Sequence, residues 1–380
     1  MEKNRKVIIG IDASRNRSGG AKAHIIGIIS EGNPEHFGIS EIHVWSFKSL
    51  LDSLPNKPWL IKHNPKALEG SLFSQIFWQF FNLRSVAKKL DINIMFTTDA
   101  STFCRFSPMV VMSQDMLSYE KGIMKTFGWK MERLRLLAIL YIQNRAMRSS
   151  KGVIFLTNYA KEIIQKNTGN LKNNIVIPHG VGDKFKEQVY TPKQLLMETS
   201  SIQCIYVSNT AMYKHQWNVV KAIADLRLKG FPIQLILAGG GNGKSRELLN
   251  KEIEKSDPNS DFVRILEFVS PDEMPNLLAK TDISIFASSC ENLPITLLES
   301  MAVGLPIACS ERGPMPEVLK DAGVFFDPEN SDSIGLAIER LIKNDSERIL
   351  NAKRAKELAL KYSWKSCSDL TWNYLIKNIN

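Results

Sequence analysis

Short apolar segments of strand length recur along the whole chain and alternate with segments of helical periodicity. Strands that alternate with helices form parallel sheets whose faces the helices cover. The pattern runs through the first half of the chain and starts again in the second. It predicts an α/β protein with two doubly wound halves of similar size. Strands are expected at residues 6–13, 92–96, 109–113, 152–157 and 175–178, and then at 203–207, 233–238, 264–269, 283–287 and 306–309.

A polar stretch separates the two halves. It contains residues 190–194 and 198–201, and domain boundaries usually fall in such exposed polar linkers. The predicted domains are therefore residues 1–190 and 191–362. Two more helices, at residues 347–360 and 365–377, are expected to end the chain.

Length and composition are those of an ordinary globular protein. The 380 residues are 44% hydrophobic and 23% charged, which suits two domains of ordinary size. No apolar run approaches the roughly eighteen residues of a membrane span, and the N-terminal segment lacks the apolar core of a signal peptide. The five cysteines are scattered and contain no Cys-x-x-Cys pair, which favours neither a zinc site nor a disulfide framework. A reducing cytoplasm is therefore expected.

Positive charge is concentrated in the first half. Residues 1–190 hold 27 Lys and Arg against 15 Asp and Glu, whereas residues 191–380 hold 22 against 24. This imbalance predicts an anionic partner for the N-terminal half, either acidic membrane lipid or a phosphate-bearing acceptor. No nucleic-acid-binding motif accompanies the charge, so nucleic acid is not expected as a partner.

Two carboxylates in residues 288–299 (SSCENLPITLLE) suggest the chemistry. Glu291 follows the predicted strand at 283–287, and Glu299 lies in the helix expected after Pro294. In doubly wound sheets, nucleotides bind at the carboxyl ends of the strands. A carboxylate there accepts hydrogen bonds from sugar or ribose hydroxyls, and the amides at the helix start favour a diphosphate.

The same stretch resembles the hallmark of retaining glycosyltransferases of family 4, which have the GT-B fold. The resemblance runs from Glu291 through Glu299 and Gly304-Leu-Pro, and continues at Gly313-Pro-Met-Pro-Glu317 and Gly323-Val-Phe-Phe-Asp327. It implies two Rossmann-like domains with the active site in the cleft between them. It also implies an acceptor-side N-terminal domain that a C-terminal helix at 363–380 completes.

The resemblance further implies roles for individual residues. Glu299 would hold the ribose, and Glu291 with Asn292 and Leu293 would hold the sugar. The family usually carries Arg and Lys in the loop after the first strand of the second domain. Here Lys214 keeps the lysine, but Asn209 replaces the arginine, so the phosphate clamp is incomplete.

The first domain carries looser matches. Gly19 and Gly20 resemble the glycine-rich loop that faces the donor diphosphate, and Asp115 lies where many relatives carry His-Asp beside the transferred sugar, with Gln114 in place of the histidine. His179 replaces the asparagine of a family turn, and the sequence leaves open contact with a substrate or a hinge role. In the second domain, Val269 is expected at the donor nucleotide.

A second motif supports a different function. Residues 238–245 (AGGGNGKS) satisfy a loose phosphate-loop pattern between a strand and a helix, as in ATP-binding proteins. Against that interpretation, Asp282 precedes its strand, whereas the acidic metal ligand of such enzymes follows one. The same residues also fit the Gly-x-Gly turn of family 4. A third alternative, favoured by the loss of the arginine at 209, is an inert nucleotide-sugar-binding partner.

The resemblance thus predicts a metal-independent glycosyltransferase that needs no cofactor. It would transfer a hexose, with retention, from a UDP- or GDP-linked sugar to a saccharide or lipid-linked saccharide in surface-glycan synthesis of the O-antigen or capsule type. The expected location is the cytoplasm or the inner face of the membrane.

Two further segments could face a membrane. Residues 72–81 (LFSQIFWQFF) are strongly aromatic at helical spacing, which favours a buried core helix over a membrane-facing one. Residues 130–148 carry basic side chains that form either a solvated face or a contact with anionic lipid. His24 lies in the first predicted helix and is expected to pack there.

Overall fold

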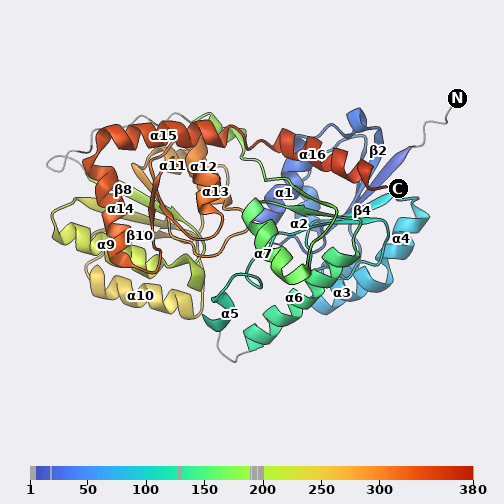
Figure 1. Cartoon of the computed structure of the whole chain (residues 1–380), viewed down its shortest axis with the longest axis horizontal. Helices are drawn as coiled ribbons and strands as arrows, with labels where there is room; N and C mark the ends of the chain where they lie inside the picture. Colours follow the sequence, from blue (N-terminus) through green and yellow to red (C-terminus); the bar gives the residue numbers. More distant parts are fainter. Residues whose placement is uncertain are drawn as a thin grey trace. The chain divides into compact units, whose positions relative to one another are not determined.

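The computed structural model describes residues 6–17, 19–126, 131–188, 190, 195 and 201–379 (Figure 1). Its contacts divide the chain into two compact units. Unit 1 comprises Met1–Gly180 and Ser363–Asn380, and unit 2 comprises Val181–Tyr362. The predicted linker residues 191–194 and 198–200, together with Ser18 and Lys130, lie outside the described residues.

Unit 1 is built on a parallel sheet whose order is β3-β2-β1-β4-β5-β6-β7. The chain moves outward from β1 to β3 and then returns to β4, so β1 and β4 flank the point where the strand order reverses. Ligands of doubly wound sheets bind at such a point, outside the carboxyl ends of the strands. The strands are β1 (Val7–Asp12), β2 (Ile39–Trp45), β3 (Leu60–His63), β4 (Ile94–Thr97), β5 (Met109–Met112), β6 (Gly152–Phe155) and β7 (Asn174–Val176).

The helices of unit 1 connect these strands, and the last helix of the chain joins them. Helix α16 packs on α1, where Ser368 donates a hydrogen bond to the carbonyl of Ile28 (2.9 Å). Gly27 and Gly180 allow this approach, because a Cβ at either residue would collide with Trp364. The helices are α1 (Gly19–Ser30), α2 (Lys48–Asp52), α3 (Leu72–Phe81), α4 (Leu83–Lys89), α5 (Ile123–Thr126), α6 (Met131–Ser149), α7 (Asn158–Thr168) and α16 (Trp364–Lys377), with 3-10 turns η1 (Pro34–Phe37) and η2 (Lys66–Leu68).

Unit 2 repeats the arrangement with the order β10-β9-β8-β11-β12-β13. All pairings in this sheet are parallel, and β8 and β11 flank its reversal point. The strands are β8 (Ile202–Val207), β9 (Ile233–Ala238), β10 (Val263–Leu266), β11 (Ile283–Phe286), β12 (Ile307–Ser310) and β13 (Val324–Phe326).

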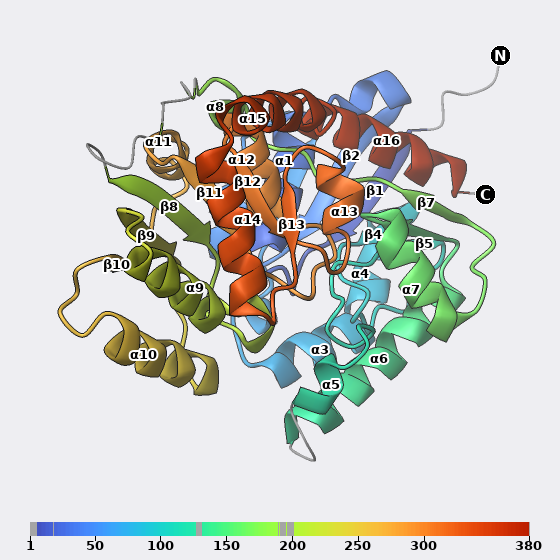
Figure 2. The same cartoon turned by 60° about the vertical axis from the view of Figure 1, so that its left-hand side comes forward.

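Helices cover this sheet in two groups (Figure 2). Helix α9 packs against α10 and α14, whereas α12 packs against α8, α11 and α15. The helices are α8 (Asp183–Lys186), η3 (Met212–Lys214), α9 (Gln216–Leu228), α10 (Lys244–Ser256), α11 (Met274–Ala279), α12 (Ile295–Val303), α13 (Met315–Leu319), α14 (Ser331–Lys343) and α15 (Asp345–Ala359).

The division between the units falls at Gly180, ten residues before the predicted one. The reason is α8, which packs on α12, and Phe185, which packs against a buried apolar cluster of unit 2 that includes Ile205 and Leu278. These contacts place residues 181–188 with the second sheet.

Candidate functional site

The reversal point of the second sheet brings together two loops that are far apart in sequence. One follows β8 and the other follows β11, and both lie at the carboxyl edge because the two strands are parallel neighbours. The amide of Ser289 donates to the carbonyl of Tyr213 (2.8 Å), and the ring Nε2 of His215 lies 2.8 Å from the Ser289 hydroxyl. The loops therefore support each other.

Lys214 and Glu291 form an ion pair between these loops. The ammonium of Lys214 contacts Oε1 of Glu291, and the side chains are only 10% and 16% exposed. The ammonium also lies 5.4 Å from the ring centre of Tyr213 and 5.5 Å from that of Phe286, within cation–π range. Tyr206 fixes the backbone by donating its hydroxyl to the carbonyl of Lys214 (2.9 Å). Lys214 and Glu291 were assigned to the donor site from two different motifs, and the structure shows that they contact each other.

Glu299 provides a second carboxylate near the start of α12. It is the fifth residue of that helix, as expected of a residue in the helix after Pro294. The side chain is half-buried, and desolvation raises the pKa of Glu299 to about 8. Within the described part of the chain, no side chain or amide donates a hydrogen bond to this carboxylate. Glu299 is therefore suited to accept hydrogen bonds from a ligand.

The other residues predicted to contact the donor differ in their burial and position. Asn292 and Leu293 are buried between Glu291 and α12, while Asn209 is exposed at the end of β8. Val269 lies three residues beyond β10 rather than inside the predicted strand, and it packs against the apolar cluster of unit 2. Among the residues that the structure describes, no group of three or more His, Cys, Asp and Glu side chains is placed to hold a metal ion.

Comparison with known families shows what kind of domain the second sheet belongs to. Residues 191–358 match the family model "Glycosyl transferases group 1", and this range contains Lys214, Glu291 and Glu299. This segment is a group 1 glycosyl transferase domain. A curated relative, O-antigen chain mannosyltransferase B from Escherichia coli, is 29% identical over 138 residues, which cover 36% of this chain and 36% of the relative.

Solved structures extend the likeness to both units. Sucrose-phosphate synthase from Thermosynechococcus elongatus aligns with a TM-score of 0.77 and 14% identity, covering 98% of this chain and 99% of that one. Anabaena Alr3699/HepE in complex with UDP-glucose aligns with a TM-score of 0.73 and 16% identity, covering 97% and 99%. At this identity the likeness concerns the fold, and it confirms the predicted GT-B architecture.

The glycine-rich loop of the group 1 glycosyl transferase domain serves packing. A Cβ at Gly239 would collide with the carbonyl of Ser208, and one at Gly241 would lie 2.6 Å from the side chain of Thr210. Ser245, which the phosphate-loop pattern assigns to a metal ion, is buried and donates to the carbonyl of Thr210 (3.2 Å). These contacts count against the ATP-binding alternative.

Unit 1 holds the remaining predicted residues. Gly19 begins α1 beyond the carboxyl end of β1, where a Cβ would meet no atom within 4 Å, and Gly20 follows it. Asp115 lies after β5 and accepts a hydrogen bond from the amide of Leu117 (3.0 Å). Burial raises the pKa of Asp115, and the nearby charge of Asp99 adds to that effect. These residues lie at the carboxyl edge of the first sheet.

The two histidines of unit 1 pack rather than face solvent. His24 and His179 are 0% and 2% exposed, and their rings stack with centres 4.7 Å apart beside Trp364. Desolvation lowers the pKa of His179 to about 3 and that of His24 well below its ordinary value. This burial favours the hinge role for His179 over contact with a substrate.

Sequence reasoning missed His215, Ser289 and Tyr206, which hold the two loops of the group 1 glycosyl transferase domain. The contact between His215 and Ser289 joins residues 74 positions apart, and the hydrogen bond from Tyr206 to Lys214 joins residues 8 positions apart. His215 also has a left-handed backbone (φ 48°), which non-glycine residues rarely adopt and which only the structure reveals.

Proposed function

We propose that this protein is a retaining glycosyltransferase that moves a hexose from a UDP- or GDP-linked sugar to a saccharide or lipid-linked saccharide acceptor. The observation that carries the proposal is the carboxyl edge of the second sheet, where the loops after β8 and β11 hold the Lys214–Glu291 pair and the helix after β11 carries the carboxylate of Glu299, which has no hydrogen-bond partner among the described residues. The group 1 glycosyl transferase match of residues 191–358 supports this assignment.

Glu299 is proposed to bind the ribose of the donor. Two neighbouring ribose hydroxyls can each donate to one carboxylate oxygen, and such charge-assisted hydrogen bonds are stronger than neutral ones. The bonds favour the ionised form, so they would compensate for the desolvation that raises the pKa of this group. The UDP-glucose in the Anabaena Alr3699/HepE structure supports a nucleotide sugar as the class of ligand.

Lys214 is proposed to neutralise the departing diphosphate. In the structure its charge is already balanced by Glu291, so the pair forms a pre-assembled, largely dehydrated site. When the donor binds, the ammonium can turn from Glu291 to a phosphate oxygen, and Glu291 can then accept hydrogen bonds from sugar hydroxyls. The negative charge of the leaving group grows in the transition state, where a fixed cation has its largest effect. This scheme uses no metal ion and no cofactor.

The acceptor is proposed to be a glycan under assembly, of the O-antigen or capsule type. The Escherichia coli relative supports this choice by its name, O-antigen chain mannosyltransferase B. We place the reaction in the cytoplasm, since all five cysteines are free thiols, as a reducing compartment allows. No helix among the described residues is long and apolar enough to cross a bilayer.

A donor panel tests the proposal. The full chain is incubated with UDP- and GDP-linked hexoses and a set of saccharide acceptors, and released nucleoside diphosphate is measured. Turnover with one donor class and none with ATP supports the assignment, and NMR of the product anomer then tests retention. Tight nucleotide binding without turnover on any acceptor would favour the inert binding partner, while ATP hydrolysis would overturn the proposal.

A further inference from the structure

Helix α3 has its polarity reversed relative to an ordinary surface helix. Phe73, Phe77 and Phe81 follow one another at intervals of four residues and are 84%, 61% and 60% exposed. The opposite face is buried and carries Gln75 and Gln79. The structure thus corrects the expectation that residues 72–81 form a buried core helix, because the aromatic stripe points to solvent.

The polar network beneath explains this orientation. Gln79 donates to the buried carboxylate of Asp12 (2.6 Å) and contacts the hydroxyl of Ser14 (3.0 Å), and Gln75 donates to the carbonyl of Gly70 (2.8 Å). Turning the phenylalanines inward would leave these buried groups without partners, which is costly. The exposed aromatic stripe is therefore a fixed feature of the fold.

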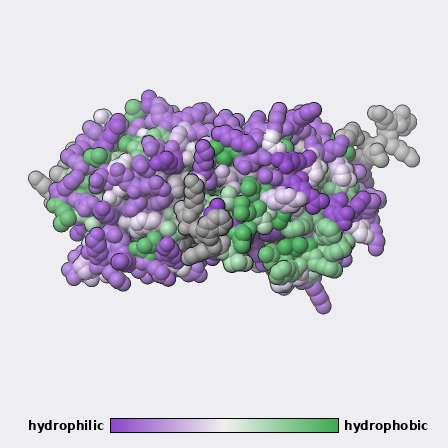
Figure 3. All heavy atoms as spheres, turned by 60° about the horizontal axis from the view of Figure 1, so that its bottom comes forward, coloured by the Kyte–Doolittle hydropathy of each residue, from purple (hydrophilic) through white to green (hydrophobic). Residues whose placement is uncertain are grey.

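Helix α6 exposes a second apolar stripe. Met131, Leu134 and Tyr141 are 76%, 58% and 71% exposed, and Leu137 is 43% exposed. Figure 3 shows apolar side chains gathered on this part of unit 1. Monomeric proteins rarely expose contiguous apolar surface of this kind without a partner.

Basic residues surround the two stripes. Helices α3, α4 and α6 together carry seven Lys and Arg but a single acidic residue, Glu132. Arg84, Lys88 and Lys89 are exposed on α4, directly after the aromatic helix. Unit 1 as a whole has 27 Lys and Arg against 14 Asp and Glu. The apolar face thus lies in a positive field, which suits an anionic and apolar partner.

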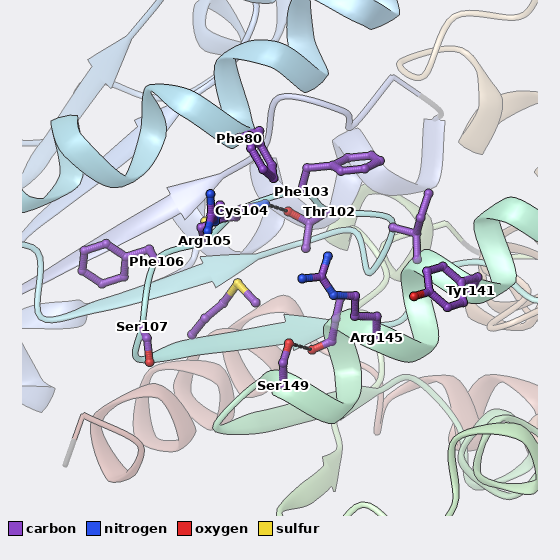
Figure 4. A pocket seen from close by; sticks show the side chains of 13 residues that line it. Phe80, Thr102, Phe103, Cys104, Arg105, Phe106, Ser107, Tyr141, Arg145 and Ser149 are labelled. Atoms are coloured by element: carbon purple, nitrogen blue, oxygen red, sulfur yellow. Dashed lines mark hydrogen bonds between the residues drawn. The ribbon is translucent and has the colours of Figure 1, made fainter.

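A pocket of about 310 Å³ lies between the two helices (Figure 4). Its walls come from Phe80 of α3, the loop at residues 102–107, and Tyr141 and Arg145 of α6. No carboxylate lines it, while Arg105 and Arg145 both do. The guanidinium of Arg105 lies over the ring of Phe80 (4.7 Å), and neither arginine forms an ion pair with any of the described residues.

The lining is suited to a phosphate ester. Guanidinium groups bind phosphate oxygens in a bidentate manner. The hydroxyls of Thr102, Ser107 and Ser149 add hydrogen-bonding groups to the walls. Cys104 supplies no competing negative charge, because burial raises the pKa of its thiol to about 12.

The pocket is made of other residues than the proposed donor site. Met109 begins β5 and Ser149 ends α6, three residues before β6 begins at Gly152, whereas Thr102 and Phe103 follow β4. None of the residues that line the pocket is Lys214, Glu291 or Glu299, so a ligand held here would have contacts of its own.

We propose that α3 and α6 dock unit 1 onto an anionic lipid bilayer, and that the pocket between them binds the phosphate of a lipid headgroup. The phenylalanines enter the acyl boundary, Arg105 and Arg145 hold the phosphate, and the basic residues of α4 contact neighbouring headgroups. This inference does not depend on the proposed glycosyl transfer, because every residue that carries it lies outside the donor site.

Vesicle binding tests the inference with the full chain. We expect cosedimentation with vesicles that contain phosphatidylglycerol, little with pure phosphatidylcholine, and a steep loss of binding as salt rises. Phe73→Ser with Phe77→Ser should weaken binding roughly a hundredfold, since burial of each ring is worth about tenfold or more. Arg105→Gln with Arg145→Gln should weaken it about twenty-fivefold, at roughly fivefold per charge.

Matched controls lie in unit 2. Phe268→Ser removes an aromatic ring that is 79% exposed, and Arg264→Gln removes an exposed arginine, so neither should change binding. Thermal melting and nucleotide binding should be unchanged in every variant, which separates a docking defect from misfolding or from failure of the proposed activity.

Three results would overturn the inference. Equal sedimentation with neutral and anionic vesicles would show that the protein does not recognise anionic lipid. Full binding by the double arginine variant would show that the pocket does not contribute to membrane binding. Protection of the pocket by inorganic phosphate or glycerol phosphate, without any vesicle binding, would assign it to a free phosphate compound instead of a bilayer.

Discussion

Each sheet places a carboxylate at its reversal point, and the two groups differ in their partners. Asp12, at the end of β1, is 4% exposed and accepts hydrogen bonds from the amide of Ser14 (3.2 Å) and from Gln79 (2.6 Å). Glu299, in α12, is more exposed yet accepts none from the described residues. Burial raises the pKa of both groups, but only Asp12 has hydrogen bonds that oppose the effect.

This difference suits the two carboxylates to different roles. Buried polar groups in folded proteins are nearly always satisfied, and Asp12 follows this rule through bonds that also orient α3. Glu299 is half-buried and accepts no hydrogen bond from the described residues, which agrees with the proposed binding of a ligand at the edge that also holds the Lys214–Glu291 pair.

The largest expected effect is on turnover. Lys214→Ala should lower kcat by roughly a hundredfold or more, because it removes the cation that meets the growing charge of the leaving group. Nucleoside diphosphate affinity should fall much less. Steady-state assays with the preferred donor measure both quantities.

Lys244→Ala is the control, since Lys244 is an exposed lysine of the glycine-rich loop, at the start of α10. It should leave kcat unchanged, whereas an ATP-binding protein would depend on it. Asn209→Arg in the Lys214→Ala background should restore part of the activity. Nearly full turnover by Lys214→Ala would show that another residue supplies the charge.

Glu299→Gln should weaken nucleoside diphosphate binding by about 1.5–3 kcal/mol, the usual contribution of hydrogen bonds to a charged group. Because the pKa of free Glu299 is about 8, binding near pH 7 should also release a proton, and affinity should rise toward pH 8. Calorimetry in buffers of different ionisation enthalpy measures the proton release. Glu311→Gln, an exposed glutamate after β12, serves as the control.

The stability of the same variant gives an independent check. Between pH 4.5 and about 8 the folded protein binds a proton at Glu299 that the unfolded chain has lost, so this residue lowers stability as pH rises through that range. Glu299→Gln should therefore raise Tm at pH 8 and leave it unchanged near pH 4.5. An unchanged affinity together with an unchanged Tm would remove Glu299 from the site.

Gln79→Leu should destabilise unit 1 by about 1–3 kcal/mol, because it leaves Oδ2 of Asp12 buried without its donor. Urea unfolding measures the loss. Gln75→Leu removes a buried glutamine of the same helix that bonds only a backbone carbonyl, and its effect should be smaller. Equal losses for the two variants would show that the Asp12 carboxylate is not what Gln79 stabilises.

The smallest expected effect concerns the stacked histidines, which also lack hydrogen-bond partners but are surrounded by rings. Their pKa values are lower in the folded protein than in the unfolded chain, so folded stability should fall as pH drops below about 6.5. His179→Asn should reduce this acid sensitivity, measured by Tm at pH 7 and pH 5. His36→Asn, on an exposed residue, should not.

Local sequence patterns predicted most of the architecture. Apolar strands buried on both faces read as continuous runs, and β9 was predicted at its observed bounds. The strands β2, β3 and β13 were missed. Polar residues interrupt β2, β3 lies at the sheet edge without a fully buried residue, and β13 has only three residues, so each gives a weak local signal.

The sequence by itself determined two doubly wound halves and the loops that hold Lys214, Glu291 and Glu299, since strand and helix periods are local properties. Tertiary structure decided which groups meet. Lys214 pairs with Glu291 across 77 residues only because β8 and β11 are neighbours. It also decided that α3 turns its phenylalanines outward, because Gln79 donates a hydrogen bond to Asp12, 67 residues earlier in the chain. The sequence shows that a helix has an apolar stripe, but whether that stripe faces the core or the solvent depends on the tertiary contacts of the opposite face.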